Sequence, residues 1–323
     1  MKKKRRIIIL LCSIFLLAAL VVSYFTLPFC VFSTTESCVT YDKNNSVISV
    51  DGDSIKVLQI TDLHVNGALD MPFTFTVIKT LVRRTAPDMI VVTGDVFSSG
   101  CSEGDVDTFL DFMDRLGLPW AAVLGNHDDE TPYSLAELSA MLEDAEGSLF
   151  KSGDLTDLYG NYFYNVEFSD GGRHKFIFMD SRSRGFTDES VAFYEDAVTA
   201  SPASDGSLVD SFLFYHIPLT ETVTAIDEYE SGRSVGTGKR GETVCDQSTE
   251  VGFFDKVVEL GSTRVMIYGH DHFNNVKTNY CGVDFNYGVK TGTSAGNSMW
   301  LVGGTLYTLN SSGEYTVEDI ILP

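Results

Sequence analysis

Short apolar segments that each end in polar residues constrain the fold of this 323-residue chain most strongly. Residues 55–60, 89–93, 120–124 and 211–215 are apolar or β-branched almost throughout. Runs of this kind are typical of strands that are buried on both faces of a sheet. Segments with helical periodicity separate these strands, at residues 73–85, 106–116, 134–145, 189–199 and 252–260.

This alternation of strands and helices predicts an α/β fold. We expect a four-layer α/β/β/α sandwich of two mixed sheets with flanking helices, because each sheet must bury both of its faces. Residues 53–323 contain no Pro- or Ser-rich linker and are therefore expected to form one domain. Residues 31–52 are polar and irregular, which predicts a stalk in front of that domain.

Charge is distributed unevenly along the chain. Residues 1–30 hold five of the 23 basic residues and no acidic residue, which leaves 18 basic and 45 acidic residues in the remainder. A protein that binds nucleic acid by neutralising phosphates needs the opposite charge. The composition therefore excludes nucleic acid as a bulk partner.

The first 30 residues predict a membrane anchor. Five basic residues at positions 2–6 precede residues 7–27, which are 21 residues without a charge. A helix of that length crosses a hydrocarbon core of ~30 Å, and the positive charges before it favour a cytoplasmic N-terminus. We expect a single-pass transmembrane helix with the domain outside the cytoplasm. The alternative is a cleaved signal peptide and a secreted protein.

Four cysteines lie beyond this N-terminal segment, at positions 38, 101, 245 and 281. In an oxidising compartment they allow three pairings. Cys245 and Cys281 flank one predicted strand, and we expect a disulfide between them in preference to the other pairs.

Residues with metal-binding side chains follow five of the predicted strands. The motifs are Asp62-x-His64, Gly94-Asp95, Gly125-Asn126-His127-Asp128, His216 and Gly269-His270-x-His272. Residues i and i+2 of an extended segment point to the same face, so a motif such as His-x-His can direct two side chains to one point. Each motif alone is common in turns. Five of them at successive strand ends predict a metal centre of imidazole and carboxylate ligands.

In this order, the five motifs resemble the signature of the calcineurin-like metallophosphoesterase superfamily over nearly all of residues 55–290. Longer strings resemble a narrower branch of it, at residues 120–130, 216–219, 252–254 and 280–282. That branch contains plant purple-acid-phosphatase-29-like proteins and the yeast dosage-dependent cell-cycle regulator phosphatase.

The resemblance implies a centre of two metal ions, which can be Mn, Fe or Zn. One ion would be held by Asp62, His64, Asp95 and His272, and the other by Asp95, Asn126, His216 and His270. The implied reaction is hydrolysis of a phosphate ester by a hydroxide that bridges the metals, and we expect phosphomonoesters to be favoured. The resemblance leaves His127 as the catalytic residue, which faces the substrate and acts on the leaving oxygen or the equatorial oxygens.

The chain departs from two groups of the superfamily. Ser98 stands where purple acid phosphatases carry a tyrosine, so iron is not required. Protein serine/threonine phosphatases carry Asp-Arg where this chain has Ser98-Ser99, so the dyad that orients their catalytic histidine is missing. The alternatives are a phosphodiesterase or a nucleotide/pyrophosphate hydrolase with the same site, or a catalytically silent binding ectodomain.

A glycine-rich segment at residues 231–242 concentrates three basic side chains in an otherwise acidic chain: Arg233, Lys239 and Arg240. Glycine-rich backbone and cations together can bind a phosphate or another anionic group of a substrate. We expect these residues to bind substrate, and the alternative is a solvated loop.

Overall fold

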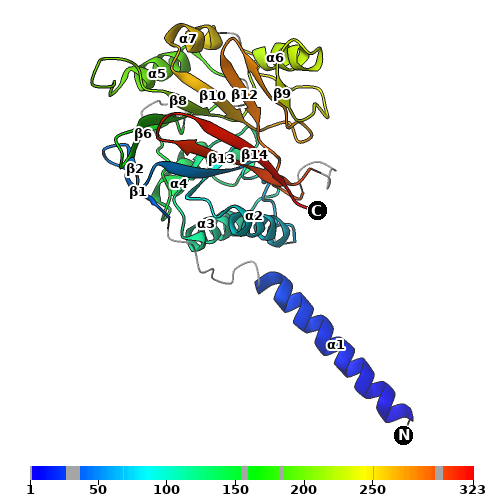
Figure 1. Cartoon of the computed structure of the whole chain (residues 1–323). Coiled ribbons are helices and arrows are strands. Elements are labelled where there is room, and N and C mark those ends of the chain that lie inside the picture. Colours follow the sequence, from blue (N-terminus) through cyan, green and yellow to red (C-terminus); the bar gives the residue numbers. More distant parts are fainter. Residues whose placement is uncertain are drawn as a thin grey trace.

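The computed structural model describes residues 2–26, 37–67, 69–153, 159–181, 183, 185–249, 251–294 and 301–323. Two β-sheets pack face to face, and helices cover the outer face of each sheet (Figure 1). The smaller sheet has five strands in the order β14-β13-β3-β4-β5. Their bounds are β3 (Ser54–Ile60), β4 (Met89–Thr93), β5 (Trp120–Val123), β13 (Gly303–Asn310) and β14 (Tyr315–Ile321).

The larger sheet has nine strands in the order β1-β2-β6-β7-β8-β10-β12-β11-β9. They are β1 (Val39–Asp42), β2 (Val47–Val50), β6 (Tyr162–Phe168), β7 (Arg173–Phe178), β8 (Ser211–Phe214), β9 (Gly236–Thr237), β10 (Thr263–Tyr268), β11 (Lys277–Tyr280) and β12 (Val283–Tyr287). Both sheets contain parallel and antiparallel pairs. The expectation of two mixed sheets with flanking helices is therefore confirmed.

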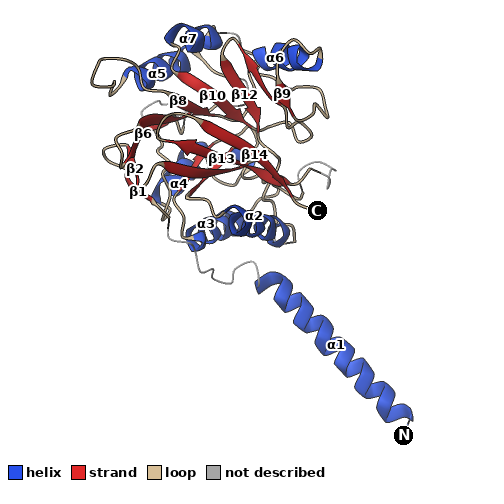
Figure 2. Ribbon diagram, viewed as in Figure 1, coloured by secondary structure: helices blue, strands red, loops and turns tan. Residues whose placement is uncertain are grey.

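Helices lie on the two outer faces (Figure 2). Beside the smaller sheet are α2 (Met71–Thr85) and α3 (Glu103–Leu116), and beside the larger sheet are α5 (Asp188–Thr199), α6 (Glu221–Glu230) and α7 (Phe253–Leu260). The remaining helices are α1 (Lys2–Thr26), α4 (Leu135–Asp144) and the 3₁₀ turn η2 (Asp128–Glu130). Capping boxes begin α3, α4 and α5, where Ser102, Ser134 and Thr187 accept the N–H of the third helical residue. These side chains satisfy helix donors that otherwise lack a partner.

Residues 31–52 were assigned to a stalk from the sequence, and this assignment is wrong for residues 39–50. They form an antiparallel pair, β1 and β2, and β2 pairs in parallel with β6. Val39, Ile48 and Val50 are buried, so these residues gain hydrophobic burial at the edge of the larger sheet.

Among the residues that the structure describes, no helix combines the length and apolar character needed to cross a membrane. The transmembrane helix expected before the domain is therefore not supported by the structure and stays a prediction from the sequence.

The expected disulfide between Cys245 and Cys281 is also wrong, because both cysteines are free and exposed. Cys281 precedes β12, whereas the N–H of Cys245 donates to the Asp271 carboxylate just after β10. Strands β10 and β12 run parallel with Tyr268 beside Tyr287. The two cysteines therefore lie at opposite ends of a five-residue strand, about 15 Å apart, whereas disulfide-linked Cα atoms lie within about 7 Å.

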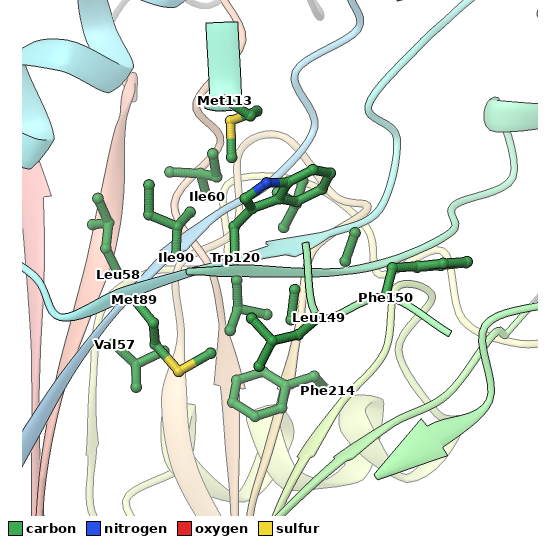
Figure 3. Close-up of a cluster of buried hydrophobic side chains, with 14 of the residues drawn as sticks. Val57, Leu58, Ile60, Met89, Ile90, Met113, Trp120, Leu149, Phe150 and Phe214 are labelled. Carbon is green, nitrogen blue, oxygen red and sulfur yellow. The ribbon is translucent and has the colours of Figure 1, made fainter. Parts of the chain in front are cut away.

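The main hydrophobic core fills the space between the sheets and extends under α2 and α3. Figure 3 shows Phe214 of β8 beside Leu149, on the side of the β5 strand opposite to Met113 of α3. Phe214 stacks on Phe178, with ring centroids 5.0 Å apart. A second cluster lies between the larger sheet and helices α5 to α7. The strands that lead to the polar motifs are therefore held by apolar contacts on both faces.

We predict that Phe214→Ala lowers the free energy of unfolding by about 3–5 kcal/mol, because it removes a buried ring between the sheets. Denaturant-induced unfolding of the full-length protein measures this change. The control is Phe73→Ala on α2, where the side chain is 55 % exposed, and its expected cost is below about 1 kcal/mol. Equal costs for the two variants would contradict this account of the core.

Candidate metal centre

The polar motifs converge because the strands that carry them are parallel neighbours. In the smaller sheet, β3, β4 and β5 pair in parallel, and their carboxyl ends lead to Asp62, Asp95 and Asn126. In the larger sheet, β8 and β10 pair in parallel and lead to His216 and His270. Sites in α/β folds form at the carboxyl ends of such strands. Here, both sheets contribute to one site.

Four of the predicted ligands have left-handed backbone conformations. Their φ angles are 53° at Asp62, 46° at His64, 51° at Asp95 and 79° at His270. Residues other than glycine rarely adopt this region, and the strain persists only where surrounding contacts hold it. The N–H of His64 donates to the carbonyl of Asp95 (3.0 Å), and the N–H of Asp62 donates to that of Gly94 (3.1 Å). The extended geometry expected for these motifs is therefore wrong, although their side chains do converge.

The first group of potential ligands consists of Asp62, His64 and His272. The Nε2 atoms of His64 and His272 lie 3.2 Å apart. The His272 Nε2 atom is 3.5 Å from Asp62 Oδ1. Two imidazole nitrogens and a carboxylate oxygen thus face one point, as a metal ion requires.

The second group consists of Asp95, His216 and His270. Nε2 of His216 lies 3.1 Å from Asp95 Oδ2 and 3.3 Å from His270 Nδ1. Oδ2 of Asp95 is also 3.5 Å from Nε2 of His64, which belongs to the first group. One carboxylate oxygen therefore lies between the two groups, where a bridging ligand is expected.

The surroundings lower the pKa of both aspartates. Burial opposes ionisation of Asp95, but the charge and hydrogen bond of His216 outweigh it and hold the pKa of Asp95 well below its usual range. Burial likewise raises the pKa of Asp62, but the hydrogen bond from His272 and the charge of His216 outweigh burial. The pKa of Asp62 is therefore lower than its usual value. Two buried carboxylates supply the negative charge that a pair of cations needs.

The histidines differ in their electrostatic setting. Burial lowers the pKa of His64, and it lowers the pKa of His270 to about 4, so both offer neutral imidazoles. Burial acts in the same direction on His216, but the Asp95 carboxylate outweighs it and raises the pKa of His216 to about 10. Nδ1 of His216 donates to the carbonyl of Thr93 at 2.8 Å, which orients Nε2 toward the site. Partners of this kind fix the tautomer of a metal-binding histidine.

Asn126 supplies an independent indication that the site suits a metal ion. Its side-chain oxygen is buried and has no hydrogen-bond partner among the described residues. A buried polar atom without a partner is costly and rare. A cation next to this oxygen would satisfy it, so the chemistry of the residues present fits a metal centre.

His127 lies beside the two groups and is not a member of either. Its ring is 5.1 Å from that of His64 between centroids, and its side chain is 40 % exposed. Its backbone N–H donates to Oδ1 of Asp95 at 2.9 Å. The expectation that His127 faces the substrate stays a prediction.

Three residues of the site were given no role from the sequence, although Asp128 belongs to one of the motifs. Asp128 is buried and accepts the N–H groups of Phe97 (2.9 Å) and Gly125 (2.7 Å), so it joins the two loops that follow β4 and β5. Glu130 accepts a hydrogen bond from His127. An acidic residue three positions after a histidine in a turn is a signal that could have indicated this pair.

The third residue is Lys290, which is only 1 % exposed. Burial lowers its pKa, while the carboxylates of Asp62 and Glu242 oppose that shift. Its charge also acts on His272. A single lysine after a buried strand gives little signal in the sequence, yet the fold places its charge next to the first group.

The basic segment at residues 231–242 packs against the chain just after His272. The N–H of Lys239 donates to the Asn275 side chain. Arg240 pairs with Asp227 and Glu230 of α6, and Arg233 lies 3.9 Å from Glu228. The structure therefore pairs two of the three basic side chains with acids of α6, and their role toward substrate stays a prediction.

Two motif glycines are required by close approach. A Cβ on Gly125 would lie 2.2 Å from Oδ1 of Asp95, and a Cβ on Gly94 would lie 2.4 Å from Nδ1 of His216. No side chain fits at such distances without displacing its neighbour. Each glycine therefore makes room for a ligand that comes from another strand.

Comparisons with known proteins agree with this geometry. The family model for calcineurin-like phosphoesterases matches residues 55–274. Among relatives, the chain is 23 % identical over 307 residues to "probable inactive purple acid phosphatase 14" of Arabidopsis thaliana, covering 80 % of this chain and 75 % of that protein. It is 27 % identical over 300 residues to the phosphatase DCR2 of Saccharomyces cerevisiae, covering 79 % of this chain and 48 % of that protein.

Among solved structures, the chain is similar to a dimetal phosphatase from Danio rerio. The TM-score is 0.55 at 13 % identity, and the match covers 82 % of this chain and 95 % of that one. At this identity, the similarity shows that the fold is shared.

We predict that Gly125→Ala reduces the metal content of the purified protein, because the added methyl group displaces the Asp95 carboxylate. Elemental analysis of the full-length protein measures bound metal per chain. The control is Gly104→Ala near the start of α3, where the nearest atom to the added Cβ is 3.9 Å away. Full metal content in Gly125→Ala would contradict the assignment of Asp95 as a shared ligand.

Proposed function

The chain belongs to the calcineurin-like phosphoesterase family, and we propose that it hydrolyses phosphate monoesters at a centre of two metal ions. The position of Asp95 carries this proposal. Its Oδ2 atom lies within 3.5 Å of histidines from both groups, so one carboxylate can serve two cations.

The residues divide between the ions as their positions suggest. Asp62, His64 and His272 would hold one metal, and Asn126, His216 and His270 the other, with Asp95 shared between them. When bound, two such ions neutralise phosphate oxygens and lower the pKa of a water molecule between them. Phosphoryl transfer depends mainly on positioning and charge neutralisation, which this centre is suited to supply.

His127 contributes to the reaction directly through its side chain. Its backbone N–H is fixed on Asp95, and its partly exposed ring lies next to His64. From there, the imidazole can donate a proton to the oxygen of the leaving alcohol or hydrogen-bond to the phosphate.

The buried charge of Lys290 favours a monoester over a diester. Its positive charge interacts with Asp62 and His272 of the first group. A phosphate monoester carries one more negative charge than a diester at neutral pH, so the additional cation stabilises it more.

Two other functions have specific observations in their favour. The chain is 31 % identical over 96 residues, 27 % of its length, to a "probable cyclic nucleotide phosphodiesterase" of Synechococcus, which favours a diesterase. Some of the plant relatives are named "probable inactive", which favours a catalytically silent binding protein. The complete set of ligands in this chain supports an enzyme instead.

We predict that full-length protein stripped of metal regains hydrolysis when Mn²⁺, Zn²⁺ or Fe²⁺ is restored. Rates with p-nitrophenyl phosphate and bis(p-nitrophenyl) phosphate are compared, and kcat/KM is expected to be higher for the monoester. Asn126→Ala should lower kcat/KM by more than about 100-fold. This loss is larger than the loss of about 10- to 100-fold that is typical of a residue that contacts a metal ligand but not the metal. The control is Asn279→Ala, at the exposed position of strand β11.

A higher kcat/KM for the bis-ester would replace the monoesterase by a diesterase. Bound metal without turnover of either ester would favour the silent binding protein. Unchanged activity in Asn126→Ala would show that the hydrolysis comes from another site or from a contaminant.

We also propose, from the sequence alone, that residues 7–27 anchor the protein in a membrane with the domain outside the cytoplasm. The support is a run of 21 residues without charge behind five basic residues.

We predict that the protein sediments with membranes after an alkaline carbonate wash and is released only by detergent. Protease added outside intact cells or vesicles of matching orientation should digest the domain. A soluble extracytoplasmic protein whose first residue lies beyond position 27 would indicate a cleaved signal peptide. A soluble cytoplasmic protein would contradict both versions.

A further inference from the structure

The substrate-facing His127 uses one of its two ring nitrogens within the protein. Nδ1 lies 2.9 Å from Oε1 of Glu130, three residues later in the η2 turn. We infer that Glu130 is the positioning residue of His127: it holds the imidazole in the orientation and tautomer that present Nε2 to the substrate. The inference rests on the proposed function.

The other oxygen of Glu130 is also engaged. Oε2 accepts the N–H of Ser99 at 2.7 Å, and Ser99 lies in the loop that follows the shared ligand Asp95. The backbone N–H of His127 returns to Oδ1 of Asp95 at 2.9 Å. Glu130 therefore links the His127 imidazole to the loop that follows Asp95, and the His127 backbone N–H contacts Asp95 itself.

The contact with Glu130 has a chemical consequence for His127. A carboxylate that accepts from Nδ1 keeps a proton on that nitrogen, so the neutral ring has its lone pair on Nε2 and the cation has its second proton there. In either state, Nε2 is the atom left for the reaction. A carboxylate has the same role toward the histidine of a Ser-His-Asp triad.

The other acids of the turn do not share this contact. Asp128 is buried and occupied by the N–H groups of Phe97 and Gly125. Asp129 is exposed, and it makes no hydrogen bond or ion pair in the described part of the chain. Glu130 is therefore the acid of η2 that contacts His127.

This contact also accounts for a departure seen in the sequence. Ser98-Ser99 occupies the place where protein serine/threonine phosphatases carry Asp-Arg, so that loop offers no carboxylate to the histidine. Here the carboxylate comes from the η2 turn, and the Ser99 backbone holds it in place.

The pair is suited to orientation more than to stability. The side chains of His127 and Glu130 are 40 % and 35 % exposed, and ion pairs at such exposure contribute little to folding. Substitution of Glu130 should therefore leave a folded protein with both metal groups intact.

The test compares Glu130→Gln with the matched control Asp129→Asn in the full-length, metal-loaded protein. An amide has one acceptor oxygen and cannot accept from both Ser99 and His127 in place of the carboxylate. We expect Glu130→Gln to lower kcat for p-nitrophenyl phosphate by about 10- to 100-fold, the range for groups that orient a functional residue. KM should change less than about twofold, and Glu130→Asp should recover part of the loss. Metal content and the activity of Asp129→Asn should match the wild type.

Two further measurements separate positioning from a structural role. In a His127→Ala background, Glu130→Gln should cause no additional loss, because residues that act through one another are not additive. Glu130→Gln should lower the rate of hydrolysis more for phenyl phosphate, whose leaving group is poorer, than for p-nitrophenyl phosphate. An equal loss with and without His127, or wild-type activity in Glu130→Gln, would overturn the inference.

A readout without turnover keeps this result distinct from a failure of the proposed function. The ring ¹⁵N chemical shifts of His127 report whether Nδ1 carries the proton. We expect a protonated Nδ1 in the wild type and in Asp129→Asn, and a shift toward a tautomer mixture in Glu130→Gln. Unchanged shifts in Glu130→Gln would contradict the inference even if the protein hydrolyses no tested ester.

Discussion

Oδ2 of Asp95 lies between His216 Nε2 at 3.1 Å and His64 Nε2 at 3.5 Å, and these histidines come from different sheets. The carboxylate is 1 % exposed, and a buried charge of this kind is stable only with several partners. Its second oxygen accepts the N–H of His127. The loops after β3, β5 and β8 must therefore all contact this one side chain. This requires the carboxyl ends of strands from both sheets to lie next to each other.

Strain in these loops is supported by the apolar parts of the fold. Four ligands have a positive φ, and Gly94 and Gly125 allow ligands to approach to distances that no Cβ permits. Such conformations cost of order 1–3 kcal/mol each and persist only in a rigid surround. The core around Trp120 and Phe214 supplies that rigidity, because both rings are buried in the apolar cluster that holds these strands.

The centre combines features of the family with features of this chain. The candidate ligands follow strand ends within residues 55–274, the part of the chain that matches the family model for calcineurin-like phosphoesterases. The surroundings of His127 add charges outside the two metal-binding groups. Ser98 and Ser99 bring no side-chain charge to it, and Glu130 and Lys290 place one negative and one positive charge near the metal groups. Differences of this kind, more than the ligands themselves, decide how a shared centre treats its substrate.

The motifs at the strand ends were predictable from the sequence because apolar runs and the residues that follow them are local patterns. The two mixed sheets and the six residues of the two metal-binding groups were identified in this way. Pairing across the chain was not predictable. His64 and His272 meet although 208 positions separate them, and Cys245 and Cys281 lie at opposite ends of β12. Residues 39–50 join the larger sheet only because β6 offers an edge for them. The sequence by itself determined which side chains can bind metal. Only the tertiary structure decided which of them share Asp95 and which acid holds His127, because contacts between distant segments depend on how the sheets pack.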